Sequence, residues 1–177
     1  MAQVSTVPAP ASDAEAVEMF LTALRHMAAA DPAAMAAQAQ AECLEAMEQG
    51  DAMSAAARAR ILAAFTAGQG YADDADYSPA SWLIHRTKVT KGTARGHLGW
   101  ARCVMAHPQV VMALAEGAVL TESMARAVCG WTDKLPASCR ETADEILLTA
   151  ARAGARKDDL AGRPGRRDLR PLPAGRR

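Results

Sequence analysis

Apolar side chains recur along most of the chain every three or four residues, which is the spacing of a helix that buries one face. The first stripe consists of Val17, Phe20, Leu21 and Leu24. Ser12 precedes this stripe and a glutamate follows Ser12 by three residues, an order typical of a capped helix start. We therefore expect an amphipathic helix over about residues 12–30.

A second helical stretch begins after Asp31 and Pro32 and is expected to reach about residue 67, with a break near Gly50. We expect its buried face to carry the large apolar side chains Leu44, Met47, Ile61, Leu62 and Phe65. A glycine-rich acidic loop over residues 68–77 ends this stretch.

Capping residues divide the rest of the chain into shorter helices. Helix starts are expected after Ser78, Thr90, His107 and Thr121, which give helices over about 79–86, 91–106, 108–117 and 121–131. A last helix is expected over about 138–153, with Ala143, Ile146, Leu147 and Ala150 facing inward.

Composition supports this all-helical pattern. The chain has 177 residues, of which 43 are alanine, while aromatic residues make up only 4%. Alanine is the best helix former, and a β-sandwich or barrel needs more β-branched and aromatic residues. We therefore expect an all-α multi-helix bundle over residues 12–160, with a disordered lead-in over 1–11.

The net charge of +0 is a sum of opposed segments. Residues 1–78 carry 3 basic and 11 acidic side chains, and residues 79–127 carry 6 basic and 2 acidic ones. The tail, residues 161–177, holds six arginines and one aspartate and has no helical period. Two explanations of this tail stay open: a basic disordered segment, or an out-of-frame translation of a GC-rich gene.

The basic segment contains a candidate helix-turn-helix over residues 79–102. Its second helix would begin after Thr90, and such a helix places its first side chains at base edges and its cations at phosphates. The DNA-contacting candidates are Lys88, Thr90, Lys91, Thr93, Arg95 and Arg102. Two helices joined by a short turn also occur in any helical bundle, so plain bundle packing remains the alternative.

Three glycines, Gly92, Gly96 and Gly99, share one side of this second helix. Each one costs about 1 kcal/mol in a helix interior, so we expect another helix or a phosphate backbone to approach closely there.

Other kinds of site have weaker support. The four histidines and four scattered cysteines fit no zinc spacing, so we expect no metal, no small-molecule cofactor and reduced thiols. No stretch predicts a secretory signal or a membrane span, and we expect a cytoplasmic protein.

Residues 42–160 resemble the actinobacterial thirteen-E-twelve repeat family, whose N-terminal part is catalogued as domain of unknown function two-two-two. The resemblance is carried by the blocks YADDADYSPASWL, TKGTARGHLGWAR, HPQVVMALAEG and CGWTDKLP. It implies an all-helical domain that commonly precedes an HNH endonuclease domain. The segment from Trp82 to Val128 is also similar, more weakly, to the helix-turn-helix core of partition-type DNA-binding proteins.

HNH chemistry requires histidines and an asparagine around a metal, and this chain has no histidine after His107 and no asparagine. We therefore expect a non-catalytic, truncated relative that binds DNA, and not an enzyme. The alternatives are a protein-interaction or homo-oligomerisation module and a decayed gene fragment.

Overall fold

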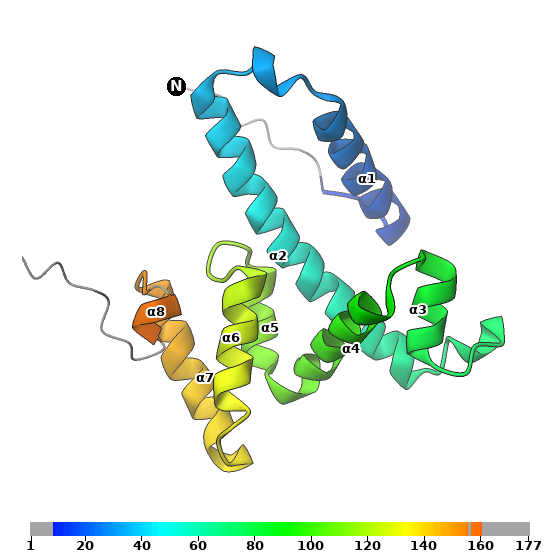
Figure 1. Cartoon of the computed structure of the whole chain (residues 1–177), viewed down its shortest axis with the longest axis vertical. Coiled ribbons are helices and arrows are strands. Elements are labelled where there is room, and N and C mark those ends of the chain that lie inside the picture. Colours follow the sequence, from blue (N-terminus) through cyan, green and yellow to red (C-terminus); the bar gives the residue numbers. More distant parts are fainter. Residues whose placement is uncertain (1–8, 156, 161–177) are drawn as a thin grey trace, which may run out of the picture. The chain divides into compact units, whose positions relative to one another are not determined.

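The computed structural model describes residues 9–155 and 157–160, and every regular element in that part of the chain is helical (Figure 1). The α-helices are α1 (Asp13–Ala29), α2 (Ala37–Ala67), α3 (Pro79–Thr87), α4 (Lys91–Ala106), α5 (Pro108–Ala115), α6 (Glu122–Thr132), α7 (Ala137–Arg152) and α8 (Lys157–Leu160). Two single 3₁₀ turns, η1 (Pro32–Ala34) and η2 (Ala72–Asp74), lie in the connections. The all-α expectation is thus confirmed. The expectations for residues 1–8 and for the tail fall outside the described residues.

Most helix starts occur at the expected capping residues. The side chains of Ser12, Ser78, Thr90 and Thr121 each accept a hydrogen bond from the backbone N–H three residues later. At Ser78 the bond is reciprocal, since the Ser78 N–H also donates to Ser81 Oγ at 3.1 Å. These bonds satisfy backbone donors that the first helical turn leaves without partners.

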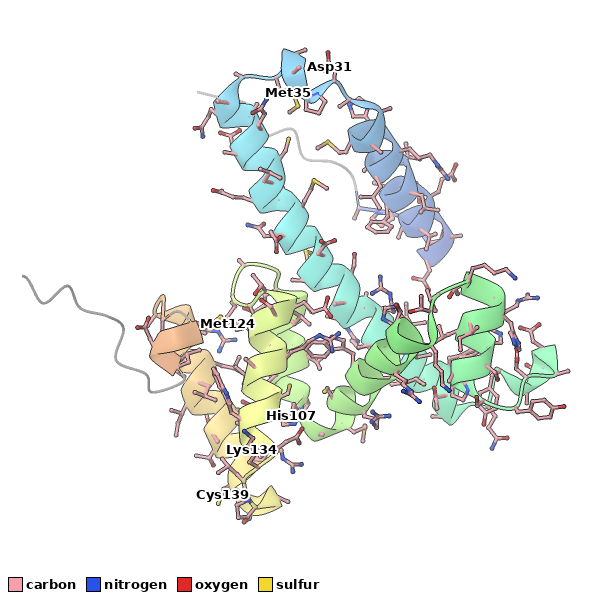
Figure 2. All side chains as sticks on the ribbon, in the orientation of Figure 1. Asp31, Met35, His107, Met124, Lys134 and Cys139 are labelled. Atoms are coloured by element: carbon pink, nitrogen blue, oxygen red, sulfur yellow. The ribbon has the colours of Figure 1, made fainter. Side chains whose placement is uncertain are left out.

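The chain divides into two compact units, Met1–Leu44 and Glu45–Arg177. In the first unit, the apolar stripe of α1 is exposed: Val17 is 58% exposed and Phe20 is 48% exposed. The Gln40 amide donates to the Pro32 carbonyl at 2.7 Å and so fixes the connection that contains Asp31 and Met35 (Figure 2).

The buried face of α2 consists of small side chains. Ala52, Ala55, Ala56, Ala59 and Leu62 are buried. The prediction that Leu44, Met47 and Ile61 lie in the core was wrong, because they are 66%, 49% and 70% exposed. The alanine stripe faces the other helices of the second unit, and its short side chains allow close helix packing. The predicted break near Gly50 was also wrong, since α2 continues through it.

Helices α5, α6 and α7 pack together in the second unit (Figure 1). Their core includes Val110, Leu114, Val128 and Leu148, all 2% exposed or less. On α7 the buried positions are Asp144, Leu148 and Ala151, one residue beyond the predicted face. Ile146, predicted to face inward, is 64% exposed.

A separate cluster holds α3 and α4 together. It contains Leu62, Leu83, Ala94 and Ala101, with Leu98 packed against it. Ala94 and Ala101 of α4 are therefore buried, whereas Met105, one turn beyond Ala101, is 85% exposed. Within the part that the structure describes, no helix is long and apolar enough to span a lipid bilayer.

Candidate nucleic-acid interface

Helices α3 and α4 are joined by the three residues 88–90. Lys88 ends α3 in the left-handed conformation, with a φ of 60°. Thr90 then caps α4 by accepting a hydrogen bond from the Thr93 N–H at 3.2 Å, and the two threonine hydroxyls lie 3.0 Å apart. The Thr90 hydroxyl therefore shapes the start of α4, so we assign Thr90 a positioning role.

All six residues predicted from the sequence to contact DNA are exposed, and they lie on one continuous segment. The set consists of Lys88, Thr90, Lys91, Thr93, Arg95 and Arg102. Arg102 lies two turns beyond Arg95, about 10 Å along the helix axis. The segment thus presents hydroxyls and cations at the start of α4 and one more cation further along.

The cations of this segment are not neutralised within the protein. Among the described residues, Lys88, Lys91, Arg95 and Arg102 form no ion pair. No aspartate or glutamate occurs anywhere between residues 76 and 116. Unpaired cations on an exposed helix attract polyanions without first having to break an internal ion pair.

The acidic loop before α3 is bonded to α3. The Trp82 indole N–H donates to Asp74 Oδ2 at 2.6 Å, and His85 Nδ1 lies 2.9 Å from Asp76 Oδ1. Arg86 is 3.7 Å from Asp74. The carboxylates of Asp74 and Asp76 therefore pair with side chains of α3 and not with the cations of α4.

The glycines of α4 leave its surface open. A side-chain carbon at Gly92 would have only the Thr90 hydroxyl within 4 Å, at 3.8 Å. One at Gly96 would reach only the Arg126 guanidinium, and one at Gly99 only the Arg102 guanidinium, each at 4.0 Å. No backbone of another described helix is that close, so close helix packing does not account for these glycines.

Helix α4 contacts α6 through Trp100. The Trp100 indole N–H donates to Glu122 Oε1 at 2.8 Å, and the Arg126 guanidinium lies 4.9 Å from the centre of the Trp100 ring. Arg126 also pairs with Glu122, as its i, i+4 spacing suggests. Arg126 is thereby neutralised, unlike the cations of the α4 segment.

His97, also on α4, adds little positive charge. Its burial and the nearby Arg58 and Arg126 guanidiniums lower the pKa of His97, against the opposing effect of Glu122. The ring is therefore mostly neutral at pH 7.

The sequence reading missed a buried polar cluster around His107. Its Nδ1 lies 2.8 Å from Asp144 Oδ2, and its Nε2 lies 3.1 Å from Asp133 Oδ1. His107 and Asp144 are 0% and 2% exposed. Figure 2 shows His107 at the same end of the α5–α7 group as Lys134, which follows Asp133. No signal in the sequence pointed to this cluster, because Asp144 lies one residue beyond the face of α7 that was predicted to be buried.

This cluster is suited to structural bonding. Both ring nitrogens of His107 face carboxylate oxygens, so their hydrogen-bonding capacity is used within the cluster. Among the described residues, no group of three or more His, Cys, Asp or Glu side chains could hold a metal ion. The cluster therefore joins α5 to α7 and to the end of α6.

No protein-family model, no curated protein and no solved structure matches this chain.

Proposed function

We propose that the chain binds double-stranded DNA through α4 and the turn before it. The observation that carries this proposal is the set of four exposed cations, Lys88, Lys91, Arg95 and Arg102, that have no ion-pair partner among the described residues. The N-terminal end of a helix also favours anions through its free N–H groups and its dipole.

The open glycine side of α4 supports the same proposal, because a sugar-phosphate backbone can approach where no side chain projects. Residues 42–160 also resemble a family that commonly carries an HNH endonuclease domain, and this resemblance is consistent with a role in contact with DNA. Neither observation specifies a base sequence. The binding that follows from this charge pattern is dominated by phosphate contacts and is strongly salt-dependent.

Fluorescence anisotropy with a labelled duplex at 50 mM salt tests the proposal. We expect Lys91→Ala combined with Arg95→Ala to weaken binding at least tenfold and to lower the slope of log K against log salt by about 2, because each phosphate contact contributes about 0.9. The matched control combines Arg60→Ala with Lys134→Ala, which removes the same charge from exposed positions outside the segment. Absence of binding by the wild-type protein, or equal losses in both double variants, would refute the proposal.

A second candidate function is self-association through α1. Val17, Phe20, Leu24 and Met27 repeat with alternating spacings of three and four residues, the pattern of a coiled-coil seam, and are between 36% and 58% exposed. The occupant of such a seam would be α1 of a second copy of this chain. Light scattering over a range of protein concentrations tests it: a dimer that Leu24→Asp dissociates is expected, and a monomer at all concentrations would exclude it.

A further inference from the structure

Two cysteines from different helices meet in the second unit. Cys103 lies on α4 and Cys129 on α6, and both are free thiols. Cys103 is half-buried, whereas Cys129 is 5% exposed. Cys129 belongs to the apolar core of the second unit, and Cys103 packs against that core. The pair thus combines an accessible sulfur with a shielded one.

Cys103 and Cys129 both line a cavity of about 470 Å³ between α4 and α6. Trp100, Arg102, Arg126 and Asp133 line the same cavity. Arg126 pairs with Glu122, and Asp133 bonds to His107, whereas Arg102 forms no ion pair among the described residues. The cavity therefore offers one free guanidinium beside an accessible sulfur, which suits a small molecule that carries a carboxylate.

We propose that Cys103 is a modification site for low-molecular-weight disulfides bearing carboxylate groups, and that Cys129 is its resolving thiol. The cavity supplies room for the incoming disulfide, and Arg102 pairs with its carboxylate. The lasting product is an intramolecular Cys103–Cys129 disulfide that joins α4 to α6. This site goes beyond the proposed DNA binding and does not depend on it.

The chemistry balances in two exchange steps. The Cys103 thiolate attacks one sulfur of the small disulfide, a mixed disulfide forms at Cys103, and one small thiolate leaves and takes a proton from water. Cys129 then loses its proton to water and attacks the Cys103 sulfur, and the second small thiolate leaves. Two protein thiols are oxidised to one disulfide, and one small disulfide is reduced to two small thiols.

The ionisation of the two thiols agrees with these roles. The hydrogen bond from Cys129 lowers the pKa of Cys103 to about 7, with help from His107 and Arg102 and against the opposing effects of burial and Asp133. The thiolate is the nucleophile in exchange, and the most effective attacking thiol has a pKa near the ambient pH. The hydrogen bond to Cys103, together with burial, raises the pKa of Cys129. Conversion of Cys103 to a mixed disulfide removes the thiolate, and so frees Cys129 to ionise for the second step.

The test treats the full-length protein with oxidised glutathione at pH 6, followed by alkylation and peptide mapping by mass spectrometry. At this pH we expect Cys103 to react about sixfold faster than a cysteine in an unstructured peptide, after allowing for the lower nucleophilicity of a less basic thiolate. The wild-type map should show a Cys103–Cys129 crosslink. A Cys103 rate no higher than that of the peptide, or a mixed disulfide at Cys103 that persists without a crosslink, would overturn the proposal.

Two variants assign the roles. In Cys129→Ala the mixed disulfide should accumulate at Cys103, and in Cys103→Ala the Cys129 thiol should stay unmodified. Modification of Cys129 in the second variant would contradict the assignment. If either variant loses its helical circular dichroism signal, the presence or absence of the Cys103–Cys129 crosslink in the wild-type protein tests the proposal by itself.

A third variant tests recognition of the carboxylate. Arg102→Gln should lower the Cys103 rate severalfold with oxidised glutathione and leave the rate with uncharged hydroxyethyl disulfide within twofold. Equal loss with both disulfides would contradict a role for the cationic cavity.

Discussion

Removal of the Asp144 carboxylate is expected to destabilise the second unit far more than removal of the Asp133 carboxylate. Both contact the same histidine, at 2.8 Å and 3.1 Å from its two ring nitrogens. The Asp144 side chain is 3% exposed, and that of Asp133 is 57% exposed. The pair of variants Asp144→Ala and Asp133→Ala therefore compares the same change in two different solvent environments.

The expected magnitudes follow from burial. Removal of one partner of a buried hydrogen bond costs about 1–3 kcal/mol, and more when the partner is a charged group, so we expect a loss of about 3 kcal/mol for Asp144→Ala. In Asp144→Ala the Nδ1 of His107 keeps only the Thr132 hydroxyl, at 3.4 Å. For Asp133→Ala the expected loss in free energy of unfolding is about 0–1 kcal/mol, since water screens an exposed carboxylate and can take over its hydrogen bond to the histidine.

Urea unfolding followed by far-UV circular dichroism measures the difference. With an m value of about 2 kcal/mol/M, a loss of about 3 kcal/mol moves the midpoint down by roughly 1.5 M. A free energy of unfolding for Asp144→Ala within about 1 kcal/mol of that for Asp133→Ala would refute the reasoning. It would mean that the buried pair is not the bond that joins α5 to α7.

Two further changes probe the backbone and the α4–α6 contact. Gly117→Ala should lower the free energy of unfolding by about 1–2 kcal/mol, because Gly117 has a φ of 72° and the added carbon would lie 3.0 Å from a neighbouring side chain. Gly130→Ala, on an open side of α6, should raise the free energy of unfolding by up to about 1 kcal/mol. Equal effects of the two variants in thermal melts would contradict this. Burial alone would raise the pKa of Glu122, but hydrogen bonds from Trp100 and Arg126 outweigh burial and lower it. A carboxyl group whose pKa is lowered by folding stabilises the folded state above its unfolded-state pKa, and this stabilisation is lost as the pH falls through its folded-state pKa. In urea unfolding, Glu122→Gln should therefore be less stable than the wild-type protein at pH 7 and equally stable near pH 2.

Helix starts were predictable because capping is local. The bonds at Ser78, Thr90 and Thr121 each join a side chain to a backbone N–H three residues later, so the residues that make them are close in the sequence. The predicted helix over 91–106 has the same bounds as α4. The same local hydrogen bonding made it possible to predict that the candidate DNA-contacting residues lie on α4 and on the turn before it.

Only the structure shows which cations on that surface lack an ion-pair partner. The sequence predicted the cations of α4 and suggested the local pair of Arg126 with Glu122, but it could not tell whether the α4 cations have ion-pair partners elsewhere in the fold. Arg126 is bonded to Glu122 and lies over Trp100, while Arg95 and Arg102 form no ion pair among the described residues. Only spatial neighbours decide which charges remain available to a polyanion.

What the sequence by itself determined is the all-α class, the capped helix starts and the positions of the cations along α4, since capping and helical periodicity depend on residues that are close in the sequence. Tertiary structure alone decided which helix faces are buried. Nine of the nineteen buried apolar residues that the structure describes are alanines, whereas Ile61 and Ile146 are exposed. The same holds for the bond between His107 and Asp144, which lie 37 residues apart. Burial depends on what a helix packs against, and an aspartate can occupy a core position only when the fold brings a matching partner to it.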